Sequence, residues 1–142
     1  MIIRAAEARD LDAVAALAGE LGYPTTPDAM ARRLAALGER DAVLVADEGG
    51  ACIGWIHVSV VESLESDRHA EIRGVVVAEA HRSAGTGAAL VRAAEDWAAR
   101  HGCPRVRVCS NVIRERTHRF YERLGYRAVK SQKVFDKSQA AG

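Results

Sequence analysis

Long hydrophobic runs, aromatic side chains and cysteines are all scarce in this 142-residue sequence. No apolar stretch approaches the ~20 residues that a membrane-spanning helix needs, so no membrane association is expected. Only seven side chains are aromatic, which leaves little for stacking on nucleic-acid bases. The three cysteines, Cys52, Cys103 and Cys109, are odd in number and lack zinc-ligand spacing. We therefore expect reduced, non-catalytic thiols, no metal and a cytoplasmic protein, which the lack of a signal-peptide core in residues 1–7 also favours.

What the sequence does have is the composition of a folded domain, with 49% hydrophobic and 27% charged residues. Its length corresponds to one domain, which we expect to span residues 1–142. The net charge of +1 conceals an asymmetry: residues 1–99 carry 9 basic and 16 acidic side chains, and residues 100–142 carry 11 basic and 3 acidic ones. Either the folded surface mixes these charges, or the protein has two ligands of opposite charge, the anionic one nearer the C-terminal half.

Strand and helix signals alternate along the chain. Helices are predicted after the caps Asp10 and Thr26, after Gly87, and over residues 115–124. Gly74, inside a strand, suggests a bulge or a close backbone approach. The order indicates an α/β or α+β domain around a mixed sheet. Short apolar runs predict its strands at residues 2–5, 42–46, 52–61, 70–77 and 105–110, with two more short strands from Tyr126 onward.

The most informative segment runs from a buried strand ending at Val77, through a loop of small residues, to a helix. Free N–H groups at a helix start favour an anion, and Arg82 adds a forked cationic donor at the entrance of the loop. A Walker loop is excluded because Ala88 follows Gly87 where a lysine is required. A dinucleotide fingerprint is excluded because Leu90 stands where a third small residue is required. The pattern that remains is Arg-x-x-Gly-x-Gly, beginning at Arg82.

Two signatures, in this order along the chain, resemble those of the GCN5-related N-acetyltransferase (GNAT) family. The first is Val-x-x-x-x-Arg-x-x-Gly-x-Gly-x-x-Leu, from Val77 to Leu90. The second is Ser-Asn-x-x-Arg-x-x-x-His-Arg-Phe-Tyr-Glu-Arg-Leu-Gly-Tyr, from Ser110 to Tyr126, and it is similar to the ending of aminoglycoside-acetyltransferase-like members. Ser83 departs from the family at a position where a second glycine is common. The resemblance covers nearly the whole chain.

This resemblance implies a fold, a cofactor and an assembly. The fold would be a mixed, mostly antiparallel sheet of six to seven strands, splayed in the middle and flanked by about four helices. Acetyl-coenzyme A would lay its pantetheine arm along the splayed strand and its pyrophosphate on the backbone amides of the loop. A homodimer is expected by analogy with the family. The residues implied in cofactor binding are Val75, Val76, Val77, Arg82, Ser83, Ala84, Gly85, Thr86, Gly87, Ala88, Asn111, Arg114 and His118.

Acetyl transfer needs a neutral amine to attack the thioester and a proton for the departing thiolate. An alkyl amine with a pKa near ~10.4 is mostly protonated, and removing its proton at pH 7 costs roughly 4–5 kcal/mol. The resemblance implies Tyr121 as the general acid, because a phenol with a pKa of about 10 keeps its proton at neutral pH. Glu71 is the expected water-mediated base, with a simple surface carboxylate as the alternative interpretation. His57 and His81 are weaker candidates for the base.

The resemblance leaves the acceptor open. Glu62, Glu65, Asp67 and Glu71 cluster around one connection between strands, and an acidic rim would attract a cationic amine unless it is only a solvated loop. We expect a primary amine of a small molecule, with N-acetylation of a protein or peptide as the alternative. A non-catalytic acyl-coenzyme A-binding module is a further alternative. We expect no nucleic-acid partner, because the pI of 7.8 is below the range typical of such domains.

Overall fold

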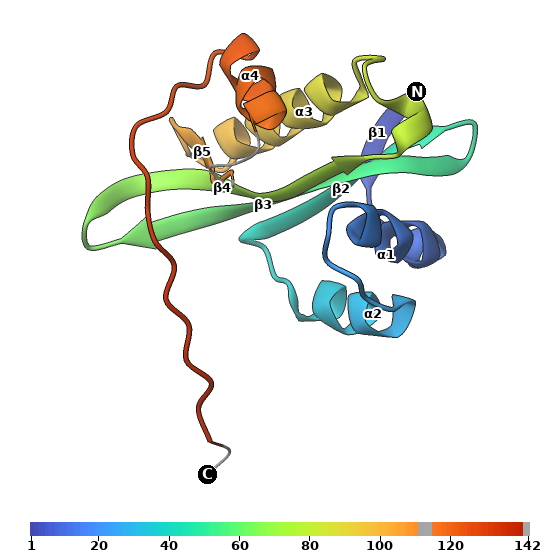
Figure 1. Cartoon of the computed structure of the whole chain (residues 1–142), viewed down its shortest axis with the longest axis horizontal. Helices are drawn as coiled ribbons and strands as arrows, with labels where there is room; N and C mark the ends of the chain where they lie inside the picture. The colour runs from blue at the N-terminus through green and yellow to red at the C-terminus, as the bar shows by residue number, and fades with distance from the viewer. Residues whose placement is uncertain (111–114, 141–142) are drawn as a thin grey trace. The chain divides into compact units, whose positions relative to one another are not determined.

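A computed structural model describes residues 1–110 and 115–140 of the chain. They group into two compact units, Met1–Cys109 and Ser110–Gly142. The first unit holds a sheet with helices on both of its faces, and the second holds one helix followed by an extended segment (Figure 1). The α/β class is confirmed, and the assignment of residues 1–142 to a single domain stays a prediction.

The sheet of the first unit is mixed and mostly antiparallel, as predicted. Its strands lie in sequence order, each antiparallel to the next except β5, which runs parallel to β4. The turn between β2 and β3 is the hairpin that Asp47 and the two following glycines indicate, and the Asp47 carboxylate accepts the Gly50 N–H at 2.7 Å. The strands are β1 (Ile2–Ala5), β2 (Asp41–Glu48), β3 (Ala51–Ser63), β4 (Ser66–Val77) and β5 (Val106–Val108).

The predicted number of six to seven strands is corrected to five among the residues that the structure describes. The two strands expected from Tyr126 onward are not formed within residues 126–140. Val134 and Phe135, two of the apolar side chains in that segment, are 91% and 87% exposed and so bury little surface there. An apolar alternation predicts a strand only where a sheet edge is there to receive it, and sequence alone does not show such an edge.

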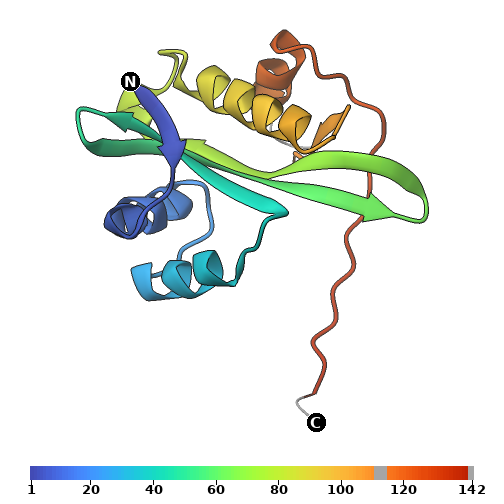
Figure 2. The ribbon, with the colours of Figure 1, turned by 180° about the vertical axis from the view of Figure 1, so that it is seen from behind.

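Helices cover both faces of the sheet in the first unit. Figures 1 and 2 show α1 (Leu11–Glu20) and α2 (Pro27–Ala36) on one face and α3 (Thr86–Arg100) on the other. Two short 3₁₀ turns, η1 (Ala8–Asp10) and η2 (Glu79–His81), precede α1 and α3. The second unit contains α4 (Glu115–Arg123). All four predicted helices are therefore present.

The two N-caps behave differently. The hydroxyl of Thr26 accepts the Ala29 N–H at 3.1 Å, which confirms it as the cap of α2. Asp10 was expected to cap α1 in the same way, but its carboxylate accepts the Glu7 N–H at 2.8 Å and so closes the preceding 3₁₀ turn. Arg4 donates to both oxygens of the same carboxylate. A guanidinium within reach thus redirects a capping side chain.

A buried cluster joins α1 to the sheet. Val14 and Leu17 of α1 pack with Trp55 of β3 and Val76 of β4, and all four side chains are buried. The indole Nε1–H of Trp55 donates to the Val14 carbonyl at 3.2 Å, so this large ring is fixed in position as well as buried. The cluster holds α1 over the strands that carry the candidate site.

Candidate active site

The sheet opens at the middle of β4, as the predicted splay requires. His57 of β3 pairs with Gly74 while the next residue, Val58, pairs with Ile72, so Arg73 is an extra, bulged residue. On its other side β4 pairs with β5 only over Ala70–Ile72. Within the described residues, the edge of β4 from Arg73 to Val77 therefore has no strand partner.

The direction of the backbone groups on this open edge follows from the ladder. The N–H of Ala78 donates to the Ile53 carbonyl at 2.7 Å, which makes these two residues a hydrogen-bonded pair. Antiparallel pairs alternate, so Val76 bonds to β3 whereas Val75 and Val77 direct their N–H and C=O groups away from it. These are the two residues expected to pair with the pantetheine arm. The Val77 carbonyl already accepts a hydrogen bond from Nε of Arg82 at 3.1 Å.

The loop after β4 presents a row of free donors. Ser83 and Gly85 both have positive φ, 68° and 86°, and this turns the chain into α3. Among the described residues, none receives a hydrogen bond from the backbone N–H groups of residues 83–88, and the first helical bond of α3 comes from Ala89 to the Gly85 carbonyl. Six N–H groups at the positive end of a 15-residue helix form a ready anion site.

Arg82 lies at the entrance of this loop. It is exposed, and one of its nitrogens is committed to the Val77 carbonyl. Its Nη2 lies 3.9 Å from Glu20, a long contact at the surface that contributes little. The two terminal nitrogens therefore stay accessible to an anion held by the loop.

Glu71, the expected base, lies in β4 two residues before the bulged Arg73. Its carboxylate forms an ion pair with Arg73, whose Nη1 lies 2.7 Å from Oε2, and the Cys109 thiol lies 3.9 Å from its other oxygen. Its side chain is only 17% exposed. The structure thus places Glu71 beside the opening of the sheet, but as one half of an ion pair.

Three more residues of the same face were not predicted from the sequence: Asp41, Ser59 and Arg73. Asp41 of β2 accepts from Ser59 Oγ at 2.5 Å and from His57 Nε2 at 2.8 Å, while Arg73 Nε donates to Ser59 Oγ at 3.2 Å. Burial acts to raise the pKa of Asp41, but the hydrogen bonds from Ser59 and His57 outweigh it and hold that pKa below its ordinary value. Spacings of two residues, His57 with Ser59 and Glu71 with Arg73, were the available signal, because such residues share a face of a strand.

A cavity of about 740 Å³ lies between α1, α2 and this face of the sheet. Its wall is mostly apolar, and Trp55 and Gly74 belong to its sheet side. A volume of this size with a few convergent polar groups is typical of a site for a small organic molecule. The polar and charged side chains in the wall are Glu7, Tyr23, Arg33, His57 and Arg73.

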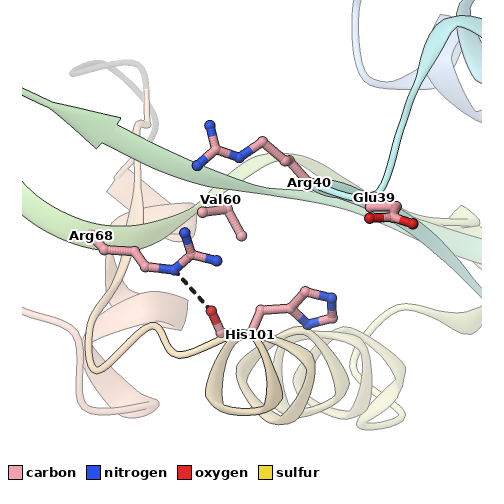
Figure 3. Close-up of a pocket in the computed structure, with 5 residues that line it drawn as sticks. All are labelled: Glu39, Arg40, Val60, Arg68 and His101. Carbon is pink, nitrogen blue, oxygen red and sulfur yellow. Dashed lines mark hydrogen bonds between the residues drawn. The ribbon is translucent and has the colours of Figure 1, made fainter.

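In the acidic cluster that was expected to attract a cationic acceptor, Glu62 is already paired with two arginines. The Glu62 carboxylate is bound by Arg40 and by Arg68, the latter at 2.5 Å. Figure 3 shows both arginines beside a separate, open pocket of about 410 Å³, with Arg68 Nε donating to the His101 carbonyl at 2.9 Å. Glu62, Glu65 and Asp67 are absent from the wall of the larger cavity. We therefore interpret this cluster as surface carboxylates of the β3–β4 hairpin, of which Glu62 is paired.

The remaining site residues belong to the second unit. Tyr121 of α4 is buried, and its ring makes edge contacts with Phe120 at 5.1 Å and Tyr126 at 5.8 Å between centroids. His118, three residues earlier on α4, is half-buried. Asn111 and Arg114 lie outside the described residues.

Other chemistry is limited in the described part of the chain. It contains no group of three or more His, Cys, Asp or Glu side chains arranged to hold a metal ion. Its helices include none long and apolar enough to cross a membrane. Cys52, Cys103 and Cys109 are free thiols, and burial raises the pKa of Cys52.

Comparisons with known proteins agree with the geometry. The sequence model described as "Acetyltransferase (GNAT) family" matches residues 10–126. A transcriptional regulator from Bacillus halodurans C-125 is similar in structure, with a TM-score of 0.86, 26% identity, and coverage of 96% of this chain and 99% of that one. An acetyltransferase from Trypanosoma brucei has a TM-score of 0.77, 26% identity, and coverage of 96% and 99%.

An aminoglycoside 6'-N-acetyltransferase, AAC(6')-IG from Acinetobacter haemolyticus, shares the fold with a TM-score of 0.84. Its identity is 21%, with coverage of 99% of this chain and 100% of that one. A comparison with curated protein sequences found no match.

Proposed function

The chain belongs to the GNAT acetyltransferase family, and from that premise we propose that it transfers the acetyl group of acetyl-coenzyme A to a primary amine of a small molecule. We propose further that it acts as a single domain and a homodimer in the cytoplasm, without a metal.

The observation that carries this proposal is the row of free N–H groups from Ser83 to Ala88 beside the open edge of β4. A pyrophosphate needs several converging donors, because one helix-terminus contact contributes only about 0.3–1 kcal/mol. The open edge offers Val75 and Val77 to an amide-bearing arm, as an added strand would use them. Val76, Arg82, Asn111, Arg114 and His118 complete the proposed cofactor set.

The proposed reaction is a direct attack of the amine on the thioester. Holding the two reactants in line offsets about 7–11 kcal/mol of the barrier, which exceeds the cost of deprotonating the amine. Tyr121 is the proposed donor of the proton that the thiolate takes up. Glu71 is the expected base through a water, although its ion pair with Arg73 gives it a second role.

A non-catalytic acyl-coenzyme A-binding module is the second candidate. It is favoured by the structural likeness to a protein named as a transcriptional regulator. Release of free thiol from acetyl-coenzyme A in the presence of an amine separates the two candidates, because a binding module releases none.

The first experiment is a thermal-shift titration with acetyl-coenzyme A, with coenzyme A and ATP as parallel ligands. A ligand at 100 times its Kd adds about 2.7 kcal/mol of stability, which is readily visible as a rise in Tm. We expect a rise with both forms of the coenzyme and none with ATP at equal concentration. No rise with either form would overturn the cofactor assignment.

A second experiment tests the acceptor classes by thiol release. Its acceptors are kanamycin, spermidine, phenethylamine and a peptide with a free N-terminus.

A further inference from the structure

Three neighbouring strands bring a chain of polar side chains to the sheet face below the cavity. The register places Asp41 opposite Ser59 and Ser59 opposite Glu71. The bulge at Arg73 lets its Nε reach Ser59, so hydrogen bonds run from Arg73 through Ser59 and Asp41 to His57. An ion pair joins Arg73 to Glu71. His57 and Arg73 are the members of this chain that line the cavity.

The contact between His57 and Asp41 determines which nitrogen of the imidazole carries the proton. Because the pKa of Asp41 is lowered, its carboxylate is ionised at neutral pH and can only accept hydrogen bonds. Nε2 of His57, 2.8 Å from Oδ1, is therefore the nitrogen that carries the proton in the tautomer that bonds to Asp41, and in this tautomer Nδ1 is an acceptor. The His57 side chain is 26% exposed, so it can exchange protons with water.

Glu71 is differently placed. Its carboxylate neutralises Arg73, and taking up a proton would break a 2.7 Å ion pair. It is also absent from the cavity wall, in which His57 lies. The same set of contacts thus uses Nε2 of His57, a residue of the cavity wall, and commits the carboxylate of Glu71 to a cation.

We infer that the acceptor amine passes its first proton to His57, that Asp41 positions the imidazole, and that Glu71 holds Arg73 in place. This inference rests on the proposed acetyl transfer and names the base of that same site. A protonated amine gives one proton to Nδ1 of His57 and becomes a nucleophile. Its nitrogen then bonds to the thioester carbon, and the carbon–sulfur bond breaks. After attack the nitrogen loses its second proton, and the departing sulfur takes up one proton and leaves as a thiol, so that these two transfers balance. His57 returns the other proton to water.

The charges facing His57 come from every side of the cavity. Asp41 of β2 favours the imidazolium that forms, and Arg73 of β4 opposes it but is balanced by Glu71. Across the cavity stand Glu7 before η1, Tyr23 after α1 and Arg33 of α2. Glu7 is paired with Arg9 at 2.8 Å. Asp41 is therefore the charge in direct contact with the ring.

The test compares four variants of the full chain: His57→Gln, Asp41→Asn, Glu71→Gln and, as a matched histidine control outside the cavity wall, His81→Gln. Phenethylamine and kanamycin serve as acceptor probes, and kcat/KM for thiol release is measured from pH 6 to pH 10. A general base contributes about 10²–10⁴-fold, so we expect His57→Gln to lose at least 100-fold at pH 7. The loss should shrink toward pH 10, where an alkyl amine deprotonates by itself near its pKa of ~10.4.

Two further readouts separate a proton acceptor from a structural residue. We expect Asp41→Asn to lose tenfold or more and His81→Gln to stay within threefold of the unaltered chain. Glu71→Gln should lose less than His57→Gln at pH 7 and should keep the pH dependence of the unaltered chain. Histidine NMR of the unliganded protein should show His57 protonated at Nε2, and Asp41→Asn should abolish that preference. Acetyl-coenzyme A should still raise the Tm of every variant.

The outcomes distinguish this inference from the function on which it rests. The inference is overturned if kcat/KM keeps its pH dependence in His57→Gln but loses it in Glu71→Gln. That result would identify Glu71 as the base. Equal losses at every pH in His57→Gln also overturn it, because they indicate a structural role. If the unaltered chain turns over neither probe and acetyl-coenzyme A gives no thermal shift, the proposed function itself fails, and the inference falls with it.

Discussion

Gly74 lies against the Trp55 indole, so that a Cβ at this position would come within 3.3 Å of both Cη2 and Cζ3 of the ring. The ring cannot easily withdraw, because its Nε1–H is bonded to the Val14 carbonyl and the ring is packed in the α1 cluster. We expect Gly74→Ala to lower the free energy of unfolding by about 1–3 kcal/mol, the usual range for overpacking. Urea denaturation measures this change.

Gly19 is the matched control for this substitution. It lies inside α1, and a Cβ there would meet nothing within 4 Å. Gly19→Ala should therefore stabilise the protein by about 0.5–1 kcal/mol through helix propensity. Equal stability of Gly74→Ala and the unaltered chain would show that the indole shifts without cost, contrary to this account.

Ser83 holds a backbone conformation that suits glycine better. Its φ of 68° is the only positive value at a non-glycine residue in the described part of the chain, and an L-residue there loses roughly 1–2 kcal/mol. Ser83→Gly removes that strain, but glycine also increases the conformational entropy of the unfolded chain, which lowers the free energy of unfolding by about 0.4–1 kcal/mol. We expect a net stabilisation between zero and ~1.6 kcal/mol, with acetyl-coenzyme A affinity retained because the N–H groups remain.

Ala84→Gly, at the next residue, is the comparison for Ser83→Gly. Ala84 has no positive φ, so glycine there should only destabilise, by about 0.4–1 kcal/mol. Thermal denaturation and the coenzyme thermal shift measure both variants. A Ser83→Gly protein less stable than Ala84→Gly would contradict the strain argument.

The parts of the fold that the sequence predicts are those with local causes. Thr26 caps α2 through a hydroxyl three residues from its partner, and Gly74 adjoins the bulged residue Arg73 and lies close to Trp55. The close packing at Gly54, by contrast, was not predicted, although a Cβ there would lie 2.9 Å from the Val76 carbonyl oxygen and 3.2 Å from Leu90. That crowding depends on a neighbouring strand and on α3, which are distant in sequence.

The candidate site divides in the same way. The loop from Ser83 to Ala88 was predictable because consecutive residues supply its donors. The partners of Glu71 and His57 were not, since Arg73 reaches Ser59 only through a register shift between β3 and β4. Tertiary contacts of this kind decide whether a carboxylate is free or paired, and residue spacing does not report them.

Arg82 should matter for coenzyme affinity more than for stability. Its Nε supports the end of β4 through the Val77 carbonyl, and its remaining nitrogens face an exposed loop. Arg82→Met keeps the apolar stem and removes every donor, so we expect the Kd for acetyl-coenzyme A to rise by about tenfold or more. The Kd of Arg82→Lys should lie between those of the unaltered chain and Arg82→Met, because lysine keeps the positive charge but lacks the forked pair of donors.

Arg92→Met, on the exposed surface of α3, controls for the loss of one positive charge in the Arg82 experiment. Isothermal titration with acetyl-coenzyme A measures all three variants. A Kd for Arg82→Met within twofold of the unaltered chain would remove Arg82 from the phosphate site.

The Arg4–Asp10 pair predicts how stability depends on pH. Asp10 is buried, and Arg4 donates to its two oxygens at 2.7 and 2.8 Å. The hydrogen bonds from Arg4 outweigh the effect of burial and hold the pKa of Asp10 below its ordinary value. As pH falls, the unfolded chain takes up this proton first, so the stabilisation is present at neutral pH. It is lost as pH drops from about 4 through the lowered pKa of the folded state.

Asp10→Asn should accordingly cost about 1–3 kcal/mol at pH 7, with the difference narrowing below pH ~4. Asp12→Asn, on the exposed side of α1, should stay within about 0.5 kcal/mol. Urea denaturation at a series of pH values measures both. If the difference in free energy of unfolding between Asp10→Asn and the unaltered chain stays constant down to pH ~3, the loss of stability comes from packing rather than from charge.

Tyr121 offers a separation of catalysis from binding. Tyr121→Phe removes the hydroxyl and keeps the ring that contacts Phe120 and Tyr126. If the phenol protonates the departing thiolate, kcat should fall by about 10²–10⁴-fold, while the thermal shift with acetyl-coenzyme A is retained. Tyr126→Phe removes a hydroxyl from the same aromatic cluster and should leave kcat within threefold. Unchanged thiol release by Tyr121→Phe would show that the thiolate is protonated by water, and Tyr121 would then be a packing residue of α4.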